Sequence, residues 1–156
     1  MSSKLNSDEK RSRILILLGD PSGVGPELVA KNLPKQSFDA IQGIILGDER
    51  VLKQGMEIAK TSFSYRKVES MEEISQEDNL CLLDLKNADP TQYEMGKSSA
   101  YAGRATAEML LKAMEILKNK QADGMCFAPL NKGNIKLAGY HYESEHALFS
   151  EHLGTH

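Results

Sequence analysis

The sequence has no tryptophan, only two cysteines and no long hydrophobic run. Two cysteines are too few for the disulfide framework of a small secreted domain, so we expect Cys81 and Cys126 to be reduced thiols buried in strands. The longest apolar run, Ile14–Leu18, is far shorter than the ~20 residues of a membrane-spanning helix. Positive charge is not in excess either, because 19 Lys and Arg face 22 Asp and Glu, which excludes a broad basic surface for nucleic acid or anionic lipid.

The chain has 156 residues, of which 40% are hydrophobic and 26% charged. These values are typical of one globular domain, or of one half of a two-domain enzyme. The polar N-terminus lacks the apolar core of a signal peptide, which favours a cytoplasmic location. We expect residues 1–12 to be a disordered tail and residues 13–156 to form the folded part.

Short apolar runs alternate with segments of helical periodicity along the folded part. Continuous short runs of this kind are typical of parallel strands that are buried on both faces of a sheet. The alternation predicts an α/β fold with three layers around a mainly parallel sheet. The expected strands cover residues 13–18, 41–46, 63–68, 80–85 and 123–127. The expected helices cover residues 26–33, 49–60, 98–118, 132–137 and 144–153.

A glycine-rich turn, Gly19–Glu27, joins the first expected strand to the first expected helix. Backbone N–H groups at such a helix start can bind an anion, which makes Asp20, Gly23 and Gly25 candidates for an anion-binding loop. The turn lacks the Gly-Lys-Ser/Thr of a P-loop and the third glycine of a dinucleotide-binding fingerprint. A tight strand-to-helix turn without a ligand is therefore an equally good interpretation.

Two further segments place polar groups before expected helices. Lys97 and Ser98 precede the longest helix, where they could hold a phosphate or a carboxylate, although a serine that only caps the helix is the favoured interpretation. Asn131 and Lys132 follow the last expected strand, at the sheet edge where α/β proteins bind ligands. For this pair, a ligand contact and a simple helix cap beside a solvated lysine are equally supported.

All four histidines fall in the last sixteen residues. A metal site needs imidazoles that converge, often at positions i and i+4 of one helix. His152 and His156 have that spacing, but Gly154 lies between them, so we expect no metal site within this chain. A histidine that contacts an anionic substrate is the better interpretation, because an imidazole can hydrogen-bond such a ligand in either protonation state.

Taken together, these motifs closely resemble those of the 4-hydroxythreonine-4-phosphate dehydrogenase family, the PdxA-type enzymes of pyridoxal phosphate biosynthesis. The likeness extends from about Ile14 to Thr155 and rests on four segments that occur in the family's order: Gly19–Glu27, Gly96–Gly103, Ala128–Lys132 and Leu137–Tyr142.

This resemblance implies one lobe of a fold similar to isocitrate and isopropylmalate dehydrogenases, in a homodimer with its site at the subunit interface. It implies oxidation, with NAD, of a 4-phosphorylated hydroxy acid such as 4-hydroxy-L-threonine phosphate, followed by decarboxylation. It also implies a divalent metal ion (Zn, Mg or Co) that acts as a Lewis acid on the reacting oxygen.

The resemblance further assigns substrate contacts to His146 and Ala147, together with Asn131 and Lys132. Ala147 stands where the family has a substrate-binding threonine, and Glu145 replaces a glycine. The lost hydroxyl removes a hydrogen bond, and the added carboxylate repels an anion. Either the substrate differs from that of the family or the site has drifted.

In the family, the metal-binding histidines and most cofactor contacts follow the segment that ends this chain. The resemblance therefore implies an N-terminal portion without the second lobe, truncated before its metal ligands and inactive alone. Uncovered apolar faces would then favour a dimer or a larger assembly. The alternative is a non-catalytic remnant that binds a phosphorylated acid or a partner chain.

Overall fold

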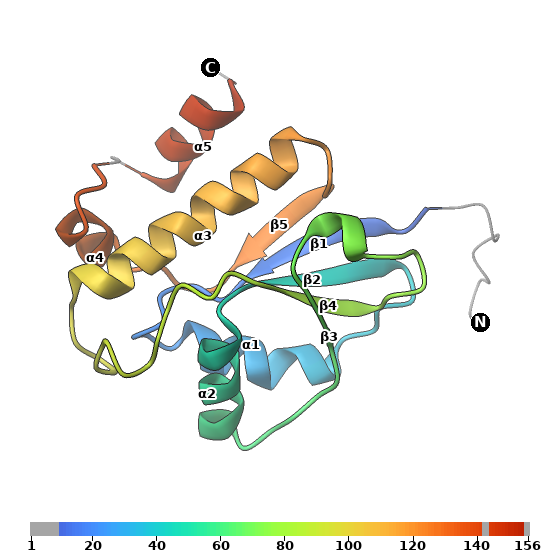
Figure 1. Ribbon diagram of the computed structural model, residues 1–156, viewed down its shortest axis with the longest axis horizontal. Helices are drawn as coiled ribbons and strands as arrows, with labels where there is room; N and C mark the ends of the chain where they lie inside the picture. The colour runs from blue at the N-terminus through green and yellow to red at the C-terminus, as the bar shows by residue number, and fades with distance from the viewer. Residues whose placement is uncertain (1–9, 142–143, 155–156) are drawn as a thin grey trace.

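A computed structural model describes residues 10–141 and 144–154 of the chain (Figure 1). In this part of the protein, one parallel sheet has the strand order β3-β4-β2-β1-β5. Its strands are β1 (Ser12–Leu17), β2 (Ile41–Gly47), β3 (Arg66–Val68), β4 (Leu80–Asp84) and β5 (Gly124–Phe127). The predicted α/β class with a parallel sheet is confirmed.

Helices cover both faces of this sheet, which gives the three expected layers (Figure 1). One face carries α1 (Gly25–Asn32) and α2 (Glu49–Ala59), which pack against each other. The other carries α3 (Ala100–Lys118), against which α4 (Lys132–Leu137) and α5 (Glu145–Leu153) pack. No helix among the described residues has both the length and the apolar composition of a membrane span.

The core is built from the short apolar runs that predict the strands. The three central strands contribute fully buried side chains, among them Leu15, Leu17, Ile44, Ile45, Leu46 and Leu82. Helix α3 adds Leu110, Met114 and Ile116, which recur at helical spacing along its inner face. Burial on both faces explains why β2 and β4 are continuous apolar runs, whereas in β1 the buried leucines alternate with partly buried isoleucines.

The expected strand over residues 63–68 is too long, because β3 contains only Arg66–Val68. β3 lies at the sheet edge and pairs with β4 alone, so little holds a longer strand there. The residues before β3 make side-chain contacts and no strand pairing. The ring of Phe63 lies 6.0 Å from that of Tyr65, and the hydroxyl of Tyr65 donates a hydrogen bond to Glu49.

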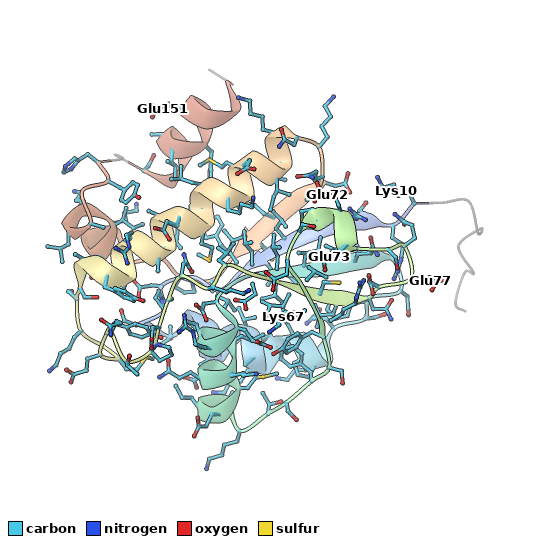
Figure 2. The ribbon with its side chains drawn as sticks, in the orientation of Figure 1. Lys10, Lys67, Glu72, Glu73, Glu77 and Glu151 are labelled. Atoms are coloured by element: carbon cyan, nitrogen blue, oxygen red, sulfur yellow. The ribbon has the colours of Figure 1, made fainter. Side chains whose placement is uncertain are left out.

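The expectation of disorder through residue 12 is wrong for Arg11 and Ser12. β1 begins at Ser12, and the Arg11 guanidinium donates to the carbonyl oxygens of Phe38 (2.8 Å) and Asp78 (2.9 Å). Figure 2 shows Lys10 and Glu77 at this amino-terminal end of the sheet. Arg11 thus joins two loops to the start of β1, which also pairs with β2 from Ser12 onward. Residues 1–9 lie outside the described part.

The two cysteines have different environments. Cys81 on β4 is buried, as expected, whereas Cys126 on β5 is exposed, so the expectation of two buried thiols is wrong for Cys126. The reason is the position of β5, which has only β1 as a strand neighbour among the described residues and lies at the sheet edge.

Helices α3 and α4 approach each other closely at Gly103. A Cβ atom at this position would collide with the backbone carbonyl group of Asn134 in α4. Only glycine therefore permits the contact that brings α4 against the first turns of α3.

The substitution Gly103→Ala tests this contact. In an ordinary helix interior, alanine stabilises by about 0.5–1 kcal/mol relative to glycine. Here the added methyl group forces α4 away, so we expect a loss of about 1–3 kcal/mol in the free energy of unfolding. Urea denaturation measures the loss, with Glu115→Ala on the exposed face of α3 as a control that changes by less than ~0.5 kcal/mol. A stabilised Gly103→Ala protein would contradict the described packing.

Candidate functional site

Three of the loops singled out in the sequence meet at the carboxyl ends of β1 and β5. We call this region the junction; it comprises residues 19–25, 96–99 and 128–134. Gly19 has a positive φ of 80°, and a Cβ atom there would lie 2.7 Å from the carbonyl oxygen of Pro129. The next residue, Asp20, donates its N–H to the same carbonyl (3.2 Å), and the N–H of Gly96 donates to the carbonyl of Ser22 (2.8 Å).

The carboxylate of Asp20 lies at the centre of the junction and is only 2% exposed. Its Oδ1 accepts hydrogen bonds from the backbone N–H (2.8 Å) and the hydroxyl (2.6 Å) of Ser22. Its Oδ2 accepts from the side-chain Nδ2 of Asn134 (2.8 Å), which is fully buried. A buried carboxylate is costly unless it is fully hydrogen-bonded, and both oxygens here have partners.

Asn134 connects this carboxylate to the two helices that start at the junction. Its Oδ1 accepts from the backbone N–H of Ser99 (3.0 Å), whose hydroxyl accepts in turn from the N–H of Ala102 and caps α3. Its own N–H donates to Oδ1 of Asn131 (3.1 Å), which caps α4. The interpretation that a serine caps the longest helix is confirmed at Ser99, and the capping interpretation of Asn131 is confirmed as well.

Sequence reasoning did not identify Asn134 or Ser22. Ser22 is a polar residue in a turn and Asn134 is one in a short helix, and neither matches a spacing typical of catalytic or ligand-binding residues. Residue type gives no signal for Asn134, because it lies in the first turn of the six-residue α4 and its partners Asp20 and Ser99 lie in distant loops.

The proposed anion-binding loop has a structural role in the described fold. Gly23 donates its N–H to the carbonyl of Asp20, and Gly25 packs against the carbonyl of Leu18. Pro26 has no backbone N–H, so the start of α1 offers one donor fewer, and Glu27 places a negative charge in the first turn. An anion at this loop remains a prediction that the charges of Asp20 and Glu27 do not favour.

The exposed rim of the junction carries the remaining candidate residues. Lys97 is 68% exposed and forms an ion pair with Glu94 (2.8 Å), and Ser98 is exposed beside it at the start of α3. Asn131 and Lys132 are exposed at the start of α4. Positive side chains next to a helix N-terminus suit a phosphate or a carboxylate.

A shallow crevice with a cavity volume of about 30 Å³ continues from this rim between α3, α4 and α5. Its walls are largely apolar, with Leu110, Ile135 and Leu148, while Lys132 and Ser144 lie at its border. Ser144 caps α5 by accepting from the N–H of Ala147, which is exposed. The crevice therefore brings Lys132 and the start of α5 to one place; the side chain of His146 lies outside the described residues.

A second cluster at the carboxyl end of β2 holds the loop that carries Lys97. Asp48 caps α2 by accepting from the N–H of Arg50 (2.8 Å), and it also accepts from the N–H of Ala88 (2.8 Å). The guanidinium of Arg50 pairs with Asp48 (2.9 Å) and with Asp89 (3.3 Å). Asp48 is not among the residues singled out from the sequence, although an aspartate between a strand and a helix is a typical N-cap.

Two opposing effects act on the pKa of Asp48. Burial raises the pKa, but the hydrogen bond from Arg50, the N–H groups of Ala88 and Arg50, and the positive charge of Arg50 together outweigh burial and lower the pKa below its usual value. The ionised form is therefore the one that the fold stabilises.

Among the described residues, no three His, Cys, Asp or Glu side chains come together as a group that could hold a metal ion. What the junction offers chemically is hydrogen-bond donors and lysine ammonium groups at two helix starts.

The sequence model of the family "pyridoxal phosphate biosynthetic protein PdxA" matches residues 39–156. The chain belongs to the PdxA family. The family resemblance deduced from the motifs is thereby confirmed, although the match begins after the Gly19–Glu27 turn.

Individual PdxA relatives agree with this assignment. A Pasteurella multocida protein, provisionally named a 4-hydroxythreonine-4-phosphate dehydrogenase, is 37% identical over 90% of this chain and 43% of its own length. A Fusobacterium nucleatum protein, provisionally named a D-threonate 4-phosphate dehydrogenase, is 29% identical over 85% of this chain and 40% of its own length.

Solved PdxA structures share the fold. The crystal structure of a 4-hydroxythreonine-4-phosphate dehydrogenase from Burkholderia phymatum matches with a TM-score of 0.84 and 28% identity, over 95% of this chain and 45% of that one. The predicted likeness to one lobe of the isocitrate dehydrogenase-like fold is confirmed. The chain spans less than half the length of the PdxA relatives that it matches.

The substitution Asn134→Ala tests whether the junction is one unit. It leaves Oδ2 of the buried Asp20 carboxylate and the N–H of Ser99 without their partner, so we expect a loss of about 2–4 kcal/mol in the free energy of unfolding. Asn131→Ala in the same helix removes only a cap and should cost about 1 kcal/mol. Urea denaturation measures the free energy of unfolding of both variants. Equal losses would mean that the side chain of Asn134 contributes no more than a helix cap and would contradict its role in joining the loops.

The lowered pKa of Asp48 predicts a pH-dependent contribution to stability. A carboxylate whose pKa is lower in the folded state stabilises the fold above its unfolded pKa, and this contribution is lost as the pH falls through the folded pKa. At pH 7, Asp48→Asn should lower the free energy of unfolding by about 2–3 kcal/mol. The difference in the free energy of unfolding between the variant and the unaltered protein should shrink as the pH falls from about 5 to about 2. Asp39→Asn, at an exposed carboxylate, is the control; a deficit independent of pH would contradict the argument.

Proposed function

We propose that the chain is part of an NAD-dependent dehydrogenase that oxidises a 4-phosphorylated hydroxy acid, after which the keto acid loses CO2. The observation that carries this proposal is the junction, because the segments that resemble the PdxA motifs meet there in a chain of that family. The names of the relatives support a phosphorylated hydroxy acid, since they specify 4-hydroxythreonine 4-phosphate or D-threonate 4-phosphate. Pyridoxal phosphate biosynthesis is the corresponding role.

Within this chain, the rim of the junction binds the anionic part of the substrate. Lys97 and Ser98 lie at the start of α3, and Asn131 and Lys132 lie at the start of α4. Both helices point their amino-terminal ends toward this rim, where the helix dipole adds to the lysine charges. Asp20 and Asn134 are buried beneath the rim, where they position these groups without contacting the substrate.

NAD supplies the hydride acceptor of such a reaction, and a divalent metal ion supplies a Lewis acid at the reacting oxygen. The described residues do not fit either group, because they include neither a cluster of metal-ligating side chains nor a dinucleotide-binding fingerprint. We therefore assign no chemical step to this chain. In our proposal its role is to bind substrate in a homodimeric cytoplasmic enzyme, and alone it is inactive.

Titration calorimetry of the purified chain tests the proposed binding role. We expect 4-hydroxythreonine 4-phosphate and D-threonate 4-phosphate to bind, and we expect Lys97→Ala and Lys132→Ala each to weaken binding about tenfold or more through loss of a charge-assisted hydrogen bond. Lys118→Ala, at the opposite end of α3, is the matched control. Binding that is unchanged by both rim variants would contradict the proposed site.

Activity measurements separate the enzyme from the alternative, a non-catalytic remnant. With NAD and Mg²⁺, Zn²⁺ or Co²⁺, the chain alone should form no NADH from either substrate. NADH formation by the chain alone would contradict the inactivity that we propose. Activity that returns when the chain is joined to the unmatched part of a relative supports an enzyme lobe, whereas binding without any such activity supports the remnant.

A further inference from the structure

The segment 85–99, which we call the strap, connects β4 to α3 at the carboxyl edge of the sheet (Figure 1). It consists of turns and irregular backbone, and it carries Lys97 and Ser98 near its end. A connection of this length in a compact domain is commonly functional and is held by contacts of its own side chains. The contacts that hold the strap therefore determine how rigidly the rim of the junction presents Lys97.

Both ends of the strap are fixed by hydrogen bonds to the loops that follow β2 and β1. Near its start, the N–H of Ala88 donates to the carboxylate of Asp48 (2.8 Å). Near its end, the N–H of Gly96 donates to the carbonyl of Ser22 (2.8 Å). Between these two anchors lies the stretch 89–95, which leads directly into Lys97.

Tyr93 joins this middle stretch to two helices. Its hydroxyl donates to Oε1 of Gln54 in α2 (3.0 Å), and its ring stacks on that of Tyr101 in α3, with ring centres 6.3 Å apart and an angle of 23° between the planes. The side chain of Tyr93 is half-buried, and burial raises the pKa of its hydroxyl to about 12. The hydroxyl therefore stays protonated at neutral pH and keeps its hydrogen bond to Gln54.

Tyr101 contacts the strap at a second point. Its hydroxyl accepts a hydrogen bond from the N–H of Asp89 (2.8 Å). The guanidinium of Arg104, one turn further along α3, lies 5.2 Å from the centre of its ring and restricts the ring orientation. Since Tyr101 lies in the first turn of α3, one side chain holds both residue 89 and residue 93 against this helix.

The stack of the two rings closes residues 94–100 into a short loop, and Lys97 is its middle residue. Gly96 in this loop has a positive φ of 76°, and the N–H of Lys97 donates to the carbonyl of Glu94 (3.1 Å), so the backbone turns tightly just before the lysine side chain. A lysine whose backbone is fixed before an anion arrives loses less conformational freedom when it binds that anion.

We propose that Tyr93 and Tyr101 are positioning residues for the anion of the substrate. They fix residues 94–98 before any ligand binds, so that Lys97 meets the anion with its backbone already in place. Both act through Lys97 and have no contact with the substrate. The inference rests on the proposed function for the identity of the ligand, whereas the order that the rings impose on the loop is measurable without a ligand.

Amide hydrogen exchange, measured by NMR on the ligand-free chain, tests the fixed loop. The informative amides are those of Gly96 and Lys97, which donate to Ser22 and Glu94. We expect Tyr93→Ala to speed exchange at both amides about tenfold, because the loop opens when one ring and its hydrogen bond are lost.

Three variants serve as comparisons for Tyr93→Ala. Tyr93→Phe keeps the ring stack and should restore most of the protection. Tyr93→Leu keeps an apolar side chain without a ring and should speed exchange as well; it replaces the alanine variant if circular dichroism shows that the latter is unfolded. Tyr65→Ala is the matched control, because Tyr65 is also half-buried and donates its hydroxyl to Glu49, away from the strap, and its loss should leave both amides unchanged.

A double-mutant cycle in the calorimetric assay tests whether the tyrosines act through Lys97. Tyr93→Ala should weaken binding of the phosphorylated acid about three- to tenfold in the unaltered chain. It should have no further effect where Lys97 is already alanine, and its full effect where Lys132 is alanine. A purely structural role would lower the affinity by the same factor in all three backgrounds.

Two outcomes would overturn the inference. One is unchanged exchange at Gly96 and Lys97 in the tyrosine variants, whatever the binding assay shows. The other is a loss of affinity that is as large in the Lys97→Ala background as in the unaltered chain, even where exchange is faster. If the unaltered chain binds neither phosphorylated acid, it is the proposed function that fails; hydrogen exchange then still decides whether the two rings fix the loop.

Discussion

The hydrogen bond between the Asp20 carboxylate and the Asn134 amide is the interaction on which the candidate site depends. It is 2.8 Å long and joins positions 114 residues apart, one after β1 and the other in the helix after β5. Both side chains are buried, so either one without the other would leave a polar group unpaired in the interior. Because Asn134 also accepts from the N–H of Ser99, the start of α3 is fixed by the same contact. The loops that carry the exposed Lys97 and Lys132 are thus joined through these two buried side chains.

Most of the fold could be predicted from the sequence, because its central strands are short runs of apolar residues with no polar face. β2 and β4 were predicted to within one residue at each end, and both lie inside the sheet with neighbours on either side. The structure differs from these predictions at an edge strand of the sheet and at the start of its first strand. β3 pairs with a single described strand, and the start of β1 is fixed by long-range hydrogen bonds of Arg11 that leave no local pattern.

The candidate site could be predicted only in its local parts. The caps at Ser99 and Asn131 follow from residue type and position, since a cap contacts a backbone N–H only three residues away. The partners of Asp20 and Asp48 depend on which loops the sheet order brings together, and nothing within a short window of sequence specifies them. Asp20, a candidate for the anion-binding loop, and Asp48 both hold loops in place.

A double-mutant cycle measures whether Asp20 and Asn134 hold the three motif loops together as one unit. Asp20→Ala, Asn134→Ala and the double variant are compared by their free energies of unfolding in urea. Because the two side chains share a buried charge-assisted hydrogen bond, the account predicts a coupling free energy of about 1–3 kcal/mol, with the double variant less destabilised than the sum of the single ones. Losses that add to within about 0.5 kcal/mol would show that the two residues act independently and would contradict the account.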